Sequence, residues 1–487
     1  MDLATFLSYE WEAMVPEFII LGVAVILSVL DLFLSKKDRR LLGWLGFIGI
    51  VGATISLVFL MKEETVTILQ DTFVLDYFAK VFKLLLLIGA SLVMLLAIGY
   101  NVKDDRFPYS EFYYLFLTAL LGAMIMSSSG ELITLFVGLE LLSISSYILA
   151  GIKKREGKSN EAALKYVING GIASSITLFG FSYIYGLSGT TNIGEISLLF
   201  SQNGTENVQY VLGLAFFVSF VGLCFKIASV PFHMWVPDVY EGAPTPVTAF
   251  LSVVSKTAGF ILIIRLFISI FGNAPTNNGL SLLWNVKPYI AVVAALTMVI
   301  GNVIALRQQN VKRMLAYSSI AHAGYILVAF VSLSPYFYLD TIWFYLLSYI
   351  FMNIGAFAII QGVGHHLSSF AGIYKSSPFL ALAMTVFLLS LAGIPGTAGF
   401  IAKFHILLSA LSTDPAHFAL ALIMIITTIV SYVYYFGVLV QIFFRPAQRE
   451  QSFQLSKTVW AVIFICMIFT ILLGIFPQIA LDLLYVS

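Results

Sequence analysis

Residues 211–240 read VLGLAFFVSFVGLCFKIASVPFHMWVPDVY, an apolar run that contains a lysine, Lys226, and a proline, Pro231. A membrane-spanning helix needs about 20 mostly apolar residues, so this run is too long for one uninterrupted span. Proline inside a helix removes a hydrogen bond and clashes with the preceding turn. In a membrane, such a break survives only where protein or water satisfies the freed backbone groups. The stretch therefore predicts a broken membrane helix.

A second run of this kind spans residues 378–411 and contains Gly393, Ile394, Pro395 and Gly396. The first break falls in the fourth apolar run of residues 111–269, and the second in the fourth run of residues 288–443. An offset of five helices inverts the second unit relative to the first. Paired broken helices in inverted repeats point to a transport site near the bilayer midplane. The two breaks, at Pro231 and Pro395, predict such a site.

Composition excludes a water-soluble globule. Of the 487 residues, 60% are hydrophobic and only 10% are charged, and the mean hydropathy is +0.96, whereas a soluble domain carries roughly a quarter charged residues. Apolar runs of span length predict an all-α integral membrane protein of about 14 transmembrane helices, with two inverted five-helix repeats that each contain a broken helix. The expected helices lie near 16–34, 41–61, 74–99, 111–128, 131–151, 161–187, 211–240, 243–269, 288–306, 313–332, 341–361, 378–411, 415–443 and 458–484.

The same pattern divides the chain into four parts. We expect an N-terminal three-helix segment at 1–110, a first antiporter-like repeat at 111–269, a second, inverted repeat at 270–443 and a C-terminal helix at 444–487.

Basic residues concentrate in alternate loops. One set of loops holds Lys36, Lys37, Arg39, Arg40, Lys103, Arg106, Lys153, Lys154, Arg155, Lys158, Arg307, Lys312, Arg313, Lys375, Arg445, Arg449 and Lys457. The opposite loops hold little more than Lys62 and Lys287. Because basic loops face the cytoplasm, both termini are predicted on the outer side of the membrane.

Four ionisable residues lie deep within the predicted spans: Glu140, Lys226, Lys256 and Lys403. A charge at the helix centre costs ~2.5–3.5 kcal/mol even on the permissive insertion scale. Glu140 lies about 13 Å along its helix from Glu131, close to the middle of a ~30 Å hydrocarbon core. Lys256 is similarly deep, and the other two lysines each flank a proline break.

These four residues fit a proton relay. A lysine in an apolar interior holds its proton less tightly, and a carboxylate that approaches it reverses this effect. We expect Glu140 and Lys226 to form the modulating pair, Lys256 to be the central carrier and Lys403 the last site before exit. Static ion pairs that join helices are the competing interpretation.

His322 extends this set, because it lies on the second helix of the second repeat, the position that Glu140 holds in the first. We expect it to relay protons as well. Other charged residues in the spans are shallower, and their stems can snorkel toward the interface: Lys80, Lys83, Lys165 and Arg265. A hinge or a proton entrance is possible at the cytoplasmic end of the first broken helix, at His233, Asp238 and Glu241.

Cofactor signals are missing from the sequence. The two cysteines, Cys224 and Cys466, lie in apolar runs without the spacing of an iron–sulfur, zinc or disulfide framework. There is no phosphate-binding glycine loop and no dinucleotide fingerprint. We therefore expect no metal, no cofactor and no redox centre in this chain. The net charge of +1 argues against nucleic acid as a partner.

The stretch from Pro231 to Phe250, PFHMWVPDVYEGAPTPVTAF, resembles the antiporter-like membrane subunits of respiratory complex I. Residues 237–251 have the form of one of the three sister subunits, and residues 254–256, 301–325 and 392–403 fit the same family. The resemblance covers nearly the whole chain. The family's functional positions fall on Glu140, Lys226, Lys256 and Lys403.

The resemblance implies a non-redox subunit of a translocase that pumps protons as NADH is oxidised by quinone. Quinone, NADH, FMN and iron–sulfur clusters would then belong to partner subunits. The implied partners are the other membrane subunits of complex I, among them the sister antiporter-like subunits, and the lipid bilayer. The implied location is the bacterial cell membrane; an organellar or thylakoid homologue would carry similar motifs.

Three other interpretations remain open from the sequence. The first is a subunit of a multisubunit cation/proton antiporter, driven by an ion gradient instead of redox chemistry. The second is a scaffold that only spaces its neighbours, and the third is an independent solute carrier. Neutralising Glu140 or Lys226 would leave proton pumping intact in a scaffold that still assembles.

Overall fold

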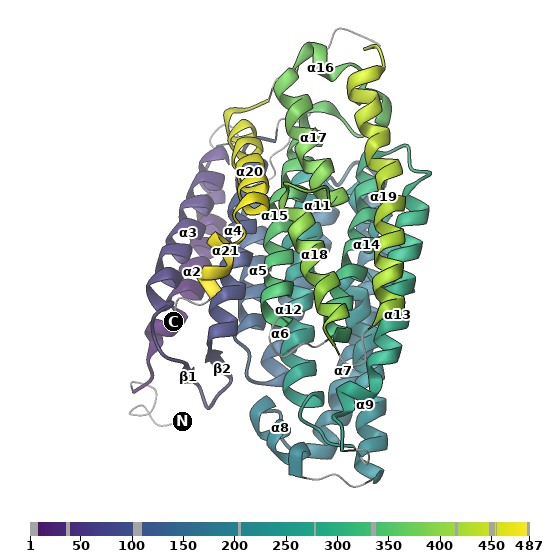
Figure 1. Cartoon of the computed structure of the whole chain (residues 1–487). Coiled ribbons are helices and arrows are strands. Elements are labelled where there is room, and N and C mark those ends of the chain that lie inside the picture. The colour runs from purple at the N-terminus through teal and green to yellow at the C-terminus, as the bar shows by residue number, and fades with distance from the viewer. Residues whose placement is uncertain are drawn as a thin grey trace.

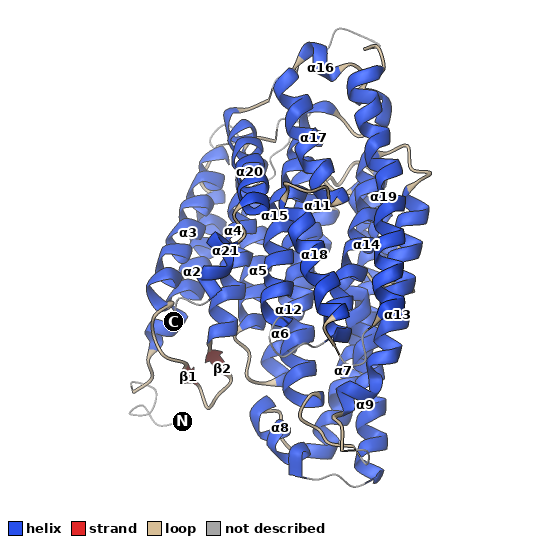
Figure 2. Ribbon diagram, viewed as in Figure 1, coloured by secondary structure: helices blue, strands red, loops and turns tan. Residues whose placement is uncertain are grey.

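The computed structural model describes residues 8–35, 39–100, 110–202, 206–276, 279–332, 338–413, 417–447, 453 and 455–484. Within these ranges the chain is almost entirely helical, and its two short strands, β1 (Val66–Ile68) and β2 (Phe73–Leu75), pair as an antiparallel hairpin (Figure 2). Five of the predicted loop cations lie outside the described residues: Lys36, Lys37, Lys103, Arg106 and Arg449.

The helices follow one another along the chain and stand side by side in one bundle (Figure 1). They are α2 (Val15–Asp31), α3 (Arg39–Leu60), α4 (Tyr77–Ile98), α5 (Glu111–Ser127), α6 (Leu132–Ala150), α7 (Gly157–Ser188), α8 (Ile193–Gln202), α9 (Glu206–Ile227), α10 (Trp235–Gly242), α11 (Thr245–Phe250), α12 (Lys256–Leu266), α13 (Leu282–Ala305), α14 (Val311–Ser332), α15 (Tyr338–Val363), α16 (Ile373–Ser376), α17 (Pro378–Ala392), α18 (Ala398–Leu411), α19 (Phe418–Phe444), α20 (Lys457–Ile475) and α21 (Gln478–Leu481). Short 3-10 turns occupy Trp11–Met14, Leu367–Phe370 and Asp482–Leu484, and π-helical turns occupy Leu251–Ser255 and Phe267–Phe271.

The prediction of an all-helical membrane protein is confirmed. Among the described residues, 12 helical segments are long and apolar enough to cross a membrane, judged by length and composition. Three shorter apolar helices, α5, α17 and α18, accompany them. The chain is therefore a multi-pass membrane protein.

The span expected at 243–269 is present as one span-length segment at 245–271, in which π-helical turns flank α12 on both sides. Two helix starts differ from those expected. Helix α13 begins at Leu282, six residues before the expected start, because Ser281 caps it by accepting a hydrogen bond from the Trp284 backbone nitrogen. Helix α14 begins at Val311 instead of 313. Hydropathy windows place such starts too late, since Asn285 and Lys287 lie near the start of α13, and Lys312 and Arg313 near the start of α14.

Three segments form the centre of the bundle. Residues 245–271, α14 and α15 are buried along nearly their whole length, whereas α2, α3, α7, α13, α19 and α20 each expose an apolar face. Side chains on α12 and α14 are thus shielded from lipid by the surrounding helices. A polar group there can reach other protein groups or internal water, but not the hydrocarbon.

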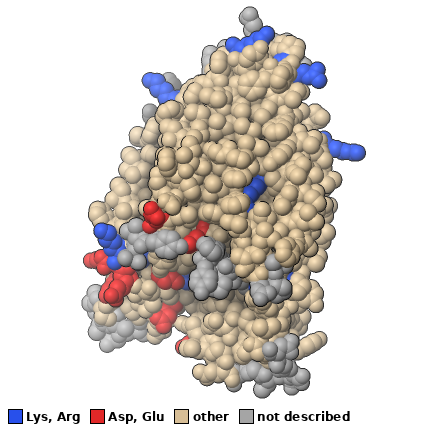
Figure 3. Space-filling view, viewed as in Figure 1, with Lys and Arg blue, Asp and Glu red and all other residues tan. Residues whose placement is uncertain are grey.

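The two ends of the bundle differ in charge. On the face in Figure 3, Asp and Glu side chains gather at the lower left, and most Lys and Arg side chains lie above them, mainly beyond a broad belt that is almost free of charge. The lower end carries the hairpin, where β2 packs with Ala13. The chain's last described turn also lies there, since Tyr77 donates a hydrogen bond to the Leu484 carbonyl. Both described ends of the chain therefore lie at the less basic end.

Candidate functional site

The first helix break separates α9 from α10 and contains Pro231. After Ile227 the backbone leaves the helix, and Ala228 adopts a positive φ of 62°. The freed Val230 backbone nitrogen donates to the Thr297 hydroxyl at 3.0 Å, so a side chain of α13 replaces a lost helical hydrogen bond. The break is thus stabilised by the protein, as a break within a membrane requires.

Lys226 lies in the last turn of α9, just before this break. It is 7% exposed, and its ammonium group donates to the Ser143 hydroxyl of α6 at 3.1 Å. Glu140 lies one turn before Ser143 and acts electrostatically on Lys226. The Glu140 Oε1 atom is buried and accepts no hydrogen bond. The structure therefore brings the predicted pair together through Ser143, without the tight contact that would lock both charges in place.

Lys256 follows the wide π-helical turn Leu251–Ser255 and is 3% exposed. Its ammonium group donates to the backbone carbonyl of Ser319 in α14 at 2.5 Å. One turn further along α12, a Cβ on Gly259 would come 3.2 Å from Lys226 Cγ. Lys226 therefore packs directly against the helix that carries Lys256. π-Helical turns often occur at functional sites, and this one sets the position of a buried charge.

His322 lies one turn after Ser319 on α14 and is 2% exposed. Its Nδ1 atom is 2.7 Å from the Tyr345 hydroxyl, and its Nε2 atom is 3.5 Å from the Tyr435 hydroxyl. The Tyr435 hydroxyl is also 2.5 Å from that of Ser318. Lys256 contacts Ser319, one turn before His322, and Lys403 lies against the Tyr325 ring, whose centre is 5.6 Å from that of the imidazole. His322 therefore lies between the contacts of the two lysines on α14, among hydroxyl groups that can donate or accept a proton.

Lys403 is held at the second break, between α17 and α18. It is 7% exposed, and it donates to the carbonyls of Leu391 at 2.9 Å and Ala392 at 3.1 Å. These are the last residues of α17, where the helix dipole favours a cation. Gly393 ends the helix with φ +84°, and a Cβ there would lie 2.9 Å from Lys403 Cδ. The glycine thus allows the lysine to reach the helix end. Lys403 also lies 4.9 Å from the centre of the Tyr325 ring.

Other charged residues in the spans lie apart from this row and have partners of their own. Arg265, expected at the interface, is mostly buried and forms two hydrogen bonds with Asp76, at 2.5 and 2.6 Å. Lys83 forms a buried ion pair with Glu17 at 2.5 Å, although the contact lacks hydrogen-bond alignment. Lys80 donates to the Glu63 carbonyl at 2.5 Å. These contacts join helices and need no transport role.

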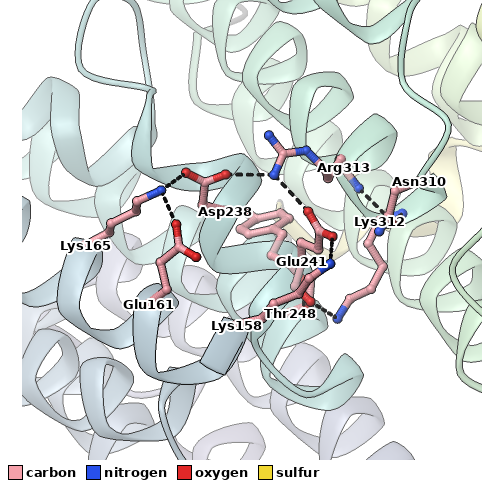
Figure 4. Close-up of polar contacts among 10 residues, drawn as sticks. Lys158, Glu161, Lys165, Asp238, Glu241, Thr248, Asn310, Lys312 and Arg313 are labelled. Atoms are coloured by element: carbon pink, nitrogen blue, oxygen red, sulfur yellow. Dashed lines mark hydrogen bonds and ion pairs between the residues drawn. The ribbon is translucent and has the colours of Figure 1, made fainter. Parts of the chain in front are cut away.

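A network of ion pairs surrounds α10, the half-helix beyond the first break (Figure 4). Asp238 accepts from Lys165 at 2.5 Å and from Arg313 at 2.7 Å. Glu241 accepts from Lys158 at 2.7 Å and from Arg313 at 2.8 Å. The network ties α10 to α7 and α14. Asp238 and Glu241, which the sequence analysis assigned to a hinge or a proton entrance, therefore hold the half-helix α10 in place. His233 is buried in the break itself, and neither ring nitrogen has a side-chain or backbone partner of good geometry.

Sequence reasoning missed two buried lysines, Lys287 and Lys312, because both were assigned to loops. Lys287 is 4% exposed on α13, and Lys312 is 1% exposed on α14, where it donates to the Ala243 carbonyl at 2.6 Å. Each lies just before the start of an expected span. The capping serine Ser281 was the signal that could have placed Lys287 inside its helix.

The structure thus brings the five sequence-predicted residues into one row across α6, α9, α12, α14 and α18. Among the described residues, no group of three or more His, Cys, Asp or Glu side chains is arranged to hold a metal ion. Cys224 and Cys466 are buried and free. The chemistry available along this row is proton transfer between amines, an imidazole, a carboxylate and hydroxyl groups.

Comparison with known proteins gives consistent matches. The family model described as "NADH:quinone oxidoreductase/Mrp antiporter, TM" matches residues 129–431. The "NADH-quinone oxidoreductase subunit N" of Anoxybacillus flavithermus is 60% identical over 490 residues, covering 99% of this chain and 98% of the relative.

Two solved structures are also similar. A chain of respiratory complex I from Thermus thermophilus with bound aureothin has a TM-score of 0.79 and 31% identity, covering 96% of this chain and 98% of that one. A chain of the Mrp complex from Dietzia sp. DQ12-45-1b also has a TM-score of 0.79, over 96% of each chain, at 22% identity. At 22% identity, the similarity to the Mrp complex chain shows only that the two chains share a fold.

Proposed function

This chain belongs to the family of NADH:quinone oxidoreductase and Mrp antiporter transmembrane subunits, and from that membership we propose that five of its buried residues form a proton path. The chain is a proton-translocating membrane subunit of NADH:quinone oxidoreductase. Its motif at 237–251 singles out one sister subunit, and the 60% identical relative bears the name of that subunit, subunit N. The resemblance seen in the sequence is confirmed.

The proposed path runs Glu140, Lys226, Lys256, His322, Lys403. One observation carries it: Lys256 donates to Ser319 and Lys403 lies against Tyr325, one turn before and one turn after His322 on α14, while Lys226 packs against the helix of Lys256. Each step therefore joins neighbours. When Glu140 draws toward Lys226, the lysine holds its proton; when the carboxylate withdraws, the proton moves toward Lys256. His322 then passes it on, and Lys403 releases it.

Backbone carbonyls take the place of counter-ions in the second half of this path. Lys403 is stabilised by the carbonyls at the end of α17, and Lys256 by the Ser319 carbonyl. A carbonyl stabilises an ammonium group less strongly than a carboxylate does. These lysines can therefore give up their protons, where a closely paired lysine could not.

Energy for this movement comes from partner subunits. The chain is a subunit of the oxidoreductase, and its proposed part is proton movement without a redox centre of its own. NADH, FMN, iron–sulfur clusters and quinone are proposed to lie in the partner subunits. The proposed membrane neighbours include the sister antiporter-like subunits.

The architecture we propose has 14 membrane passages, if the broken pairs α9–α10 and α17–α18 each count as one and 245–271 as another. Residues 111–269 and 270–443 would form two inverted five-helix repeats, flanked by a three-helix segment at 1–110 and a C-terminal helix at 444–487. The location of both described ends at the less basic end supports outward-facing termini in a bacterial cell membrane.

The test uses the assembled complex in inverted membrane vesicles, with NADH oxidation and the pH gradient measured together. Lys226→Met and Glu140→Gln should lower the number of protons moved per NADH oxidised. Lys154→Met, a change at a lysine that is 69% exposed in a surface ion pair with Glu111, is the control and should leave this ratio unchanged. Normal pumping by assembled Lys226→Met complexes would support the scaffold interpretation.

Purification distinguishes a subunit of NADH:quinone oxidoreductase from a subunit of a gradient-driven cation/proton antiporter. A chain tagged at its C-terminus should bring down NADH-, iron–sulfur- and quinone-binding subunits from mild detergent. Recovery with antiporter-type membrane subunits alone would support the gradient-driven alternative.

A further inference from the structure

Lys287 is one of the two buried lysines that the sequence analysis missed. It lies between Lys403 and the outer end of the bundle. It is 4% exposed, although it lies in the second turn of α13. Lysines this near a helix end usually snorkel to the interface. Lys287 instead points inward, 3.3 Å from the centre of the Trp284 ring and 3.5 Å from the carbonyl of Ser332. An ionisable group buried within a membrane span marks a functional site by default.

Ser332 connects Lys287 to the helix of Lys403. Its hydroxyl is 2.6 Å from that of Ser409 on α18, and both serines are 1% exposed. Two contacts therefore join α14 to α18: Tyr325 with Lys403, and Ser332 with Ser409. Both helices run toward the less basic end. The second contact lies about 10 Å closer to that end, at 1.5 Å per residue.

His417 stands beyond Lys287 at the surface. It precedes α19, is partly exposed and interacts electrostatically with Lys287. Its backbone nitrogen donates to the Ala410 carbonyl at 3.0 Å, next to Ser409. His417 therefore lies beside the end of α18, next to Ser409, and is accessible at the surface.

We propose that Lys287 is a proton-carrying residue of the outer release route, which runs from Lys403 through the Ser409–Ser332 hydroxyl pair and Lys287 to His417. Each hydroxyl accepts one proton as it gives up another, and the Lys287 amine takes up one proton and passes one on, so no group is consumed. Internal water carries the proton across the stretch between Lys403 and the serines. This route rests on the proposed path and extends it to the surface.

A purely structural role for Lys287 is the competing explanation, because a cation at the end of α14 also stabilises that helix end. Arginine separates the two roles. Lys287→Arg keeps a positive charge near Ser332, but its guanidinium group does not give up its proton. A structural role predicts that arginine restores function. A proton-carrying role predicts that arginine fails as fully as methionine.

The experiment measures protons moved per NADH oxidised by assembled complex in inverted vesicles, for Lys287→Arg, Lys287→Met and the benchmark Lys403→Met. The matched control is Lys80→Met, which removes another buried lysine that donates to a backbone carbonyl near the same end. We expect both Lys287 variants to fall to the level of Lys403→Met, and Lys80→Met to stay at the wild-type ratio.

A wild-type ratio in Lys287→Arg would overturn the release route, and it would do so even if Lys287→Met failed to assemble. The proposed path itself is judged separately. If Lys226→Met and Lys403→Met lower the ratio while Lys287→Arg does not, only the release route falls. If complexes with Lys226→Met pump normally, the proposed path is refuted, and the release route that rests on it is refuted as well.

Discussion

The ammonium group of Lys403 lies 2.9 Å from the carbonyl oxygen of Leu391, at the end of the half-helix that precedes its own. The break between α17 and α18 therefore creates the binding site of the lysine that follows it. An unbroken helix would use that carbonyl for its own hydrogen bonding. Lys312 uses the same device at the end of α10, where it donates to Ala243.

The second break should be intolerant of any side chain at Gly399. A Cβ there would come 1.9 Å from the Ser390 carbonyl, which is backbone and cannot swing away. Gly399→Ala should therefore force α18 away from α17, at a cost of about 1–3 kcal/mol, and lower both thermal stability and pumping. Gly437→Ala is the control, since nothing lies within 4 Å of its Cβ. Equal melting temperatures in detergent for the two variants would contradict this packing.

Ser143→Ala should weaken the link between Glu140 and Lys226. The variant removes the hydroxyl that accepts from Lys226 at 3.1 Å. A buried hydrogen bond contributes about 0.5–1.5 kcal/mol, so we expect pumping to slow by about two- to tenfold. Ser146→Ala, one turn further along α6, removes a bond to the Leu142 carbonyl of the same helix and should have little effect. Indistinguishable pumping rates in the two variants would argue against a role for Ser143.

Tyr345→Phe should impair the relay at His322. The variant deletes the hydroxyl that lies 2.7 Å from Nδ1, the shorter of the two hydrogen bonds to the imidazole. Loss of this partner leaves a buried ring nitrogen unsatisfied, which costs about 1–3 kcal/mol. Proton translocation should fall at least fivefold or so, with NADH oxidation falling alongside if the two are tightly coupled. Tyr185→Phe, at an exposed position, provides the comparison and should pump normally.

The Glu17–Lys83 pair should behave as a structural clip. Lys83→Met leaves a carboxylate that is 2% exposed without its cation, and breaking such a pair costs about 3–5 kcal/mol. Assembly of the complex should fall accordingly. The double variant Glu17→Leu/Lys83→Met removes both charges and should recover most of the stability. If the double variant assembles but does not pump, the pair belongs to the transport machinery.

Asp238→Asn should loosen α10 at the basic end of the bundle. Asp238 accepts from both Lys165 and Arg313, but the group is partly exposed, so solvent screening limits the loss to about 1 kcal/mol. Thermal stability should drop modestly, and more so at low salt than at high salt. Glu161→Gln removes one exposed ion pair to Lys165 and should change stability very little. A larger loss of thermal stability in Glu161→Gln than in Asp238→Asn would show that the ion pair on α7 contributes more to the network than the contacts of Asp238 do.

The sequence by itself determined the class of protein, the two breaks and five of the buried ionisable residues. Hydrocarbon forbids unpaired backbone groups and charges, so proline and lysine inside apolar runs stand out without any knowledge of packing. Depth along the chain identified Glu140, Lys226, Lys256 and Lys403 as candidates, and the repeat pattern added His322. The motif at 231–250 then indicated the family.

Tertiary structure alone decided which of these groups meet. The Lys226–Ser143 contact joins residues 83 positions apart, and Lys256 meets Ser319 across 63. No local pattern encodes such pairings, because helix packing sets them. The burial of Lys287 and Lys312 likewise depends on which helices cover them, and a hydropathy window sees only the flanking residues. The depth of a residue in the membrane follows from one chain segment, whereas its contact partner depends on how two segments pack together.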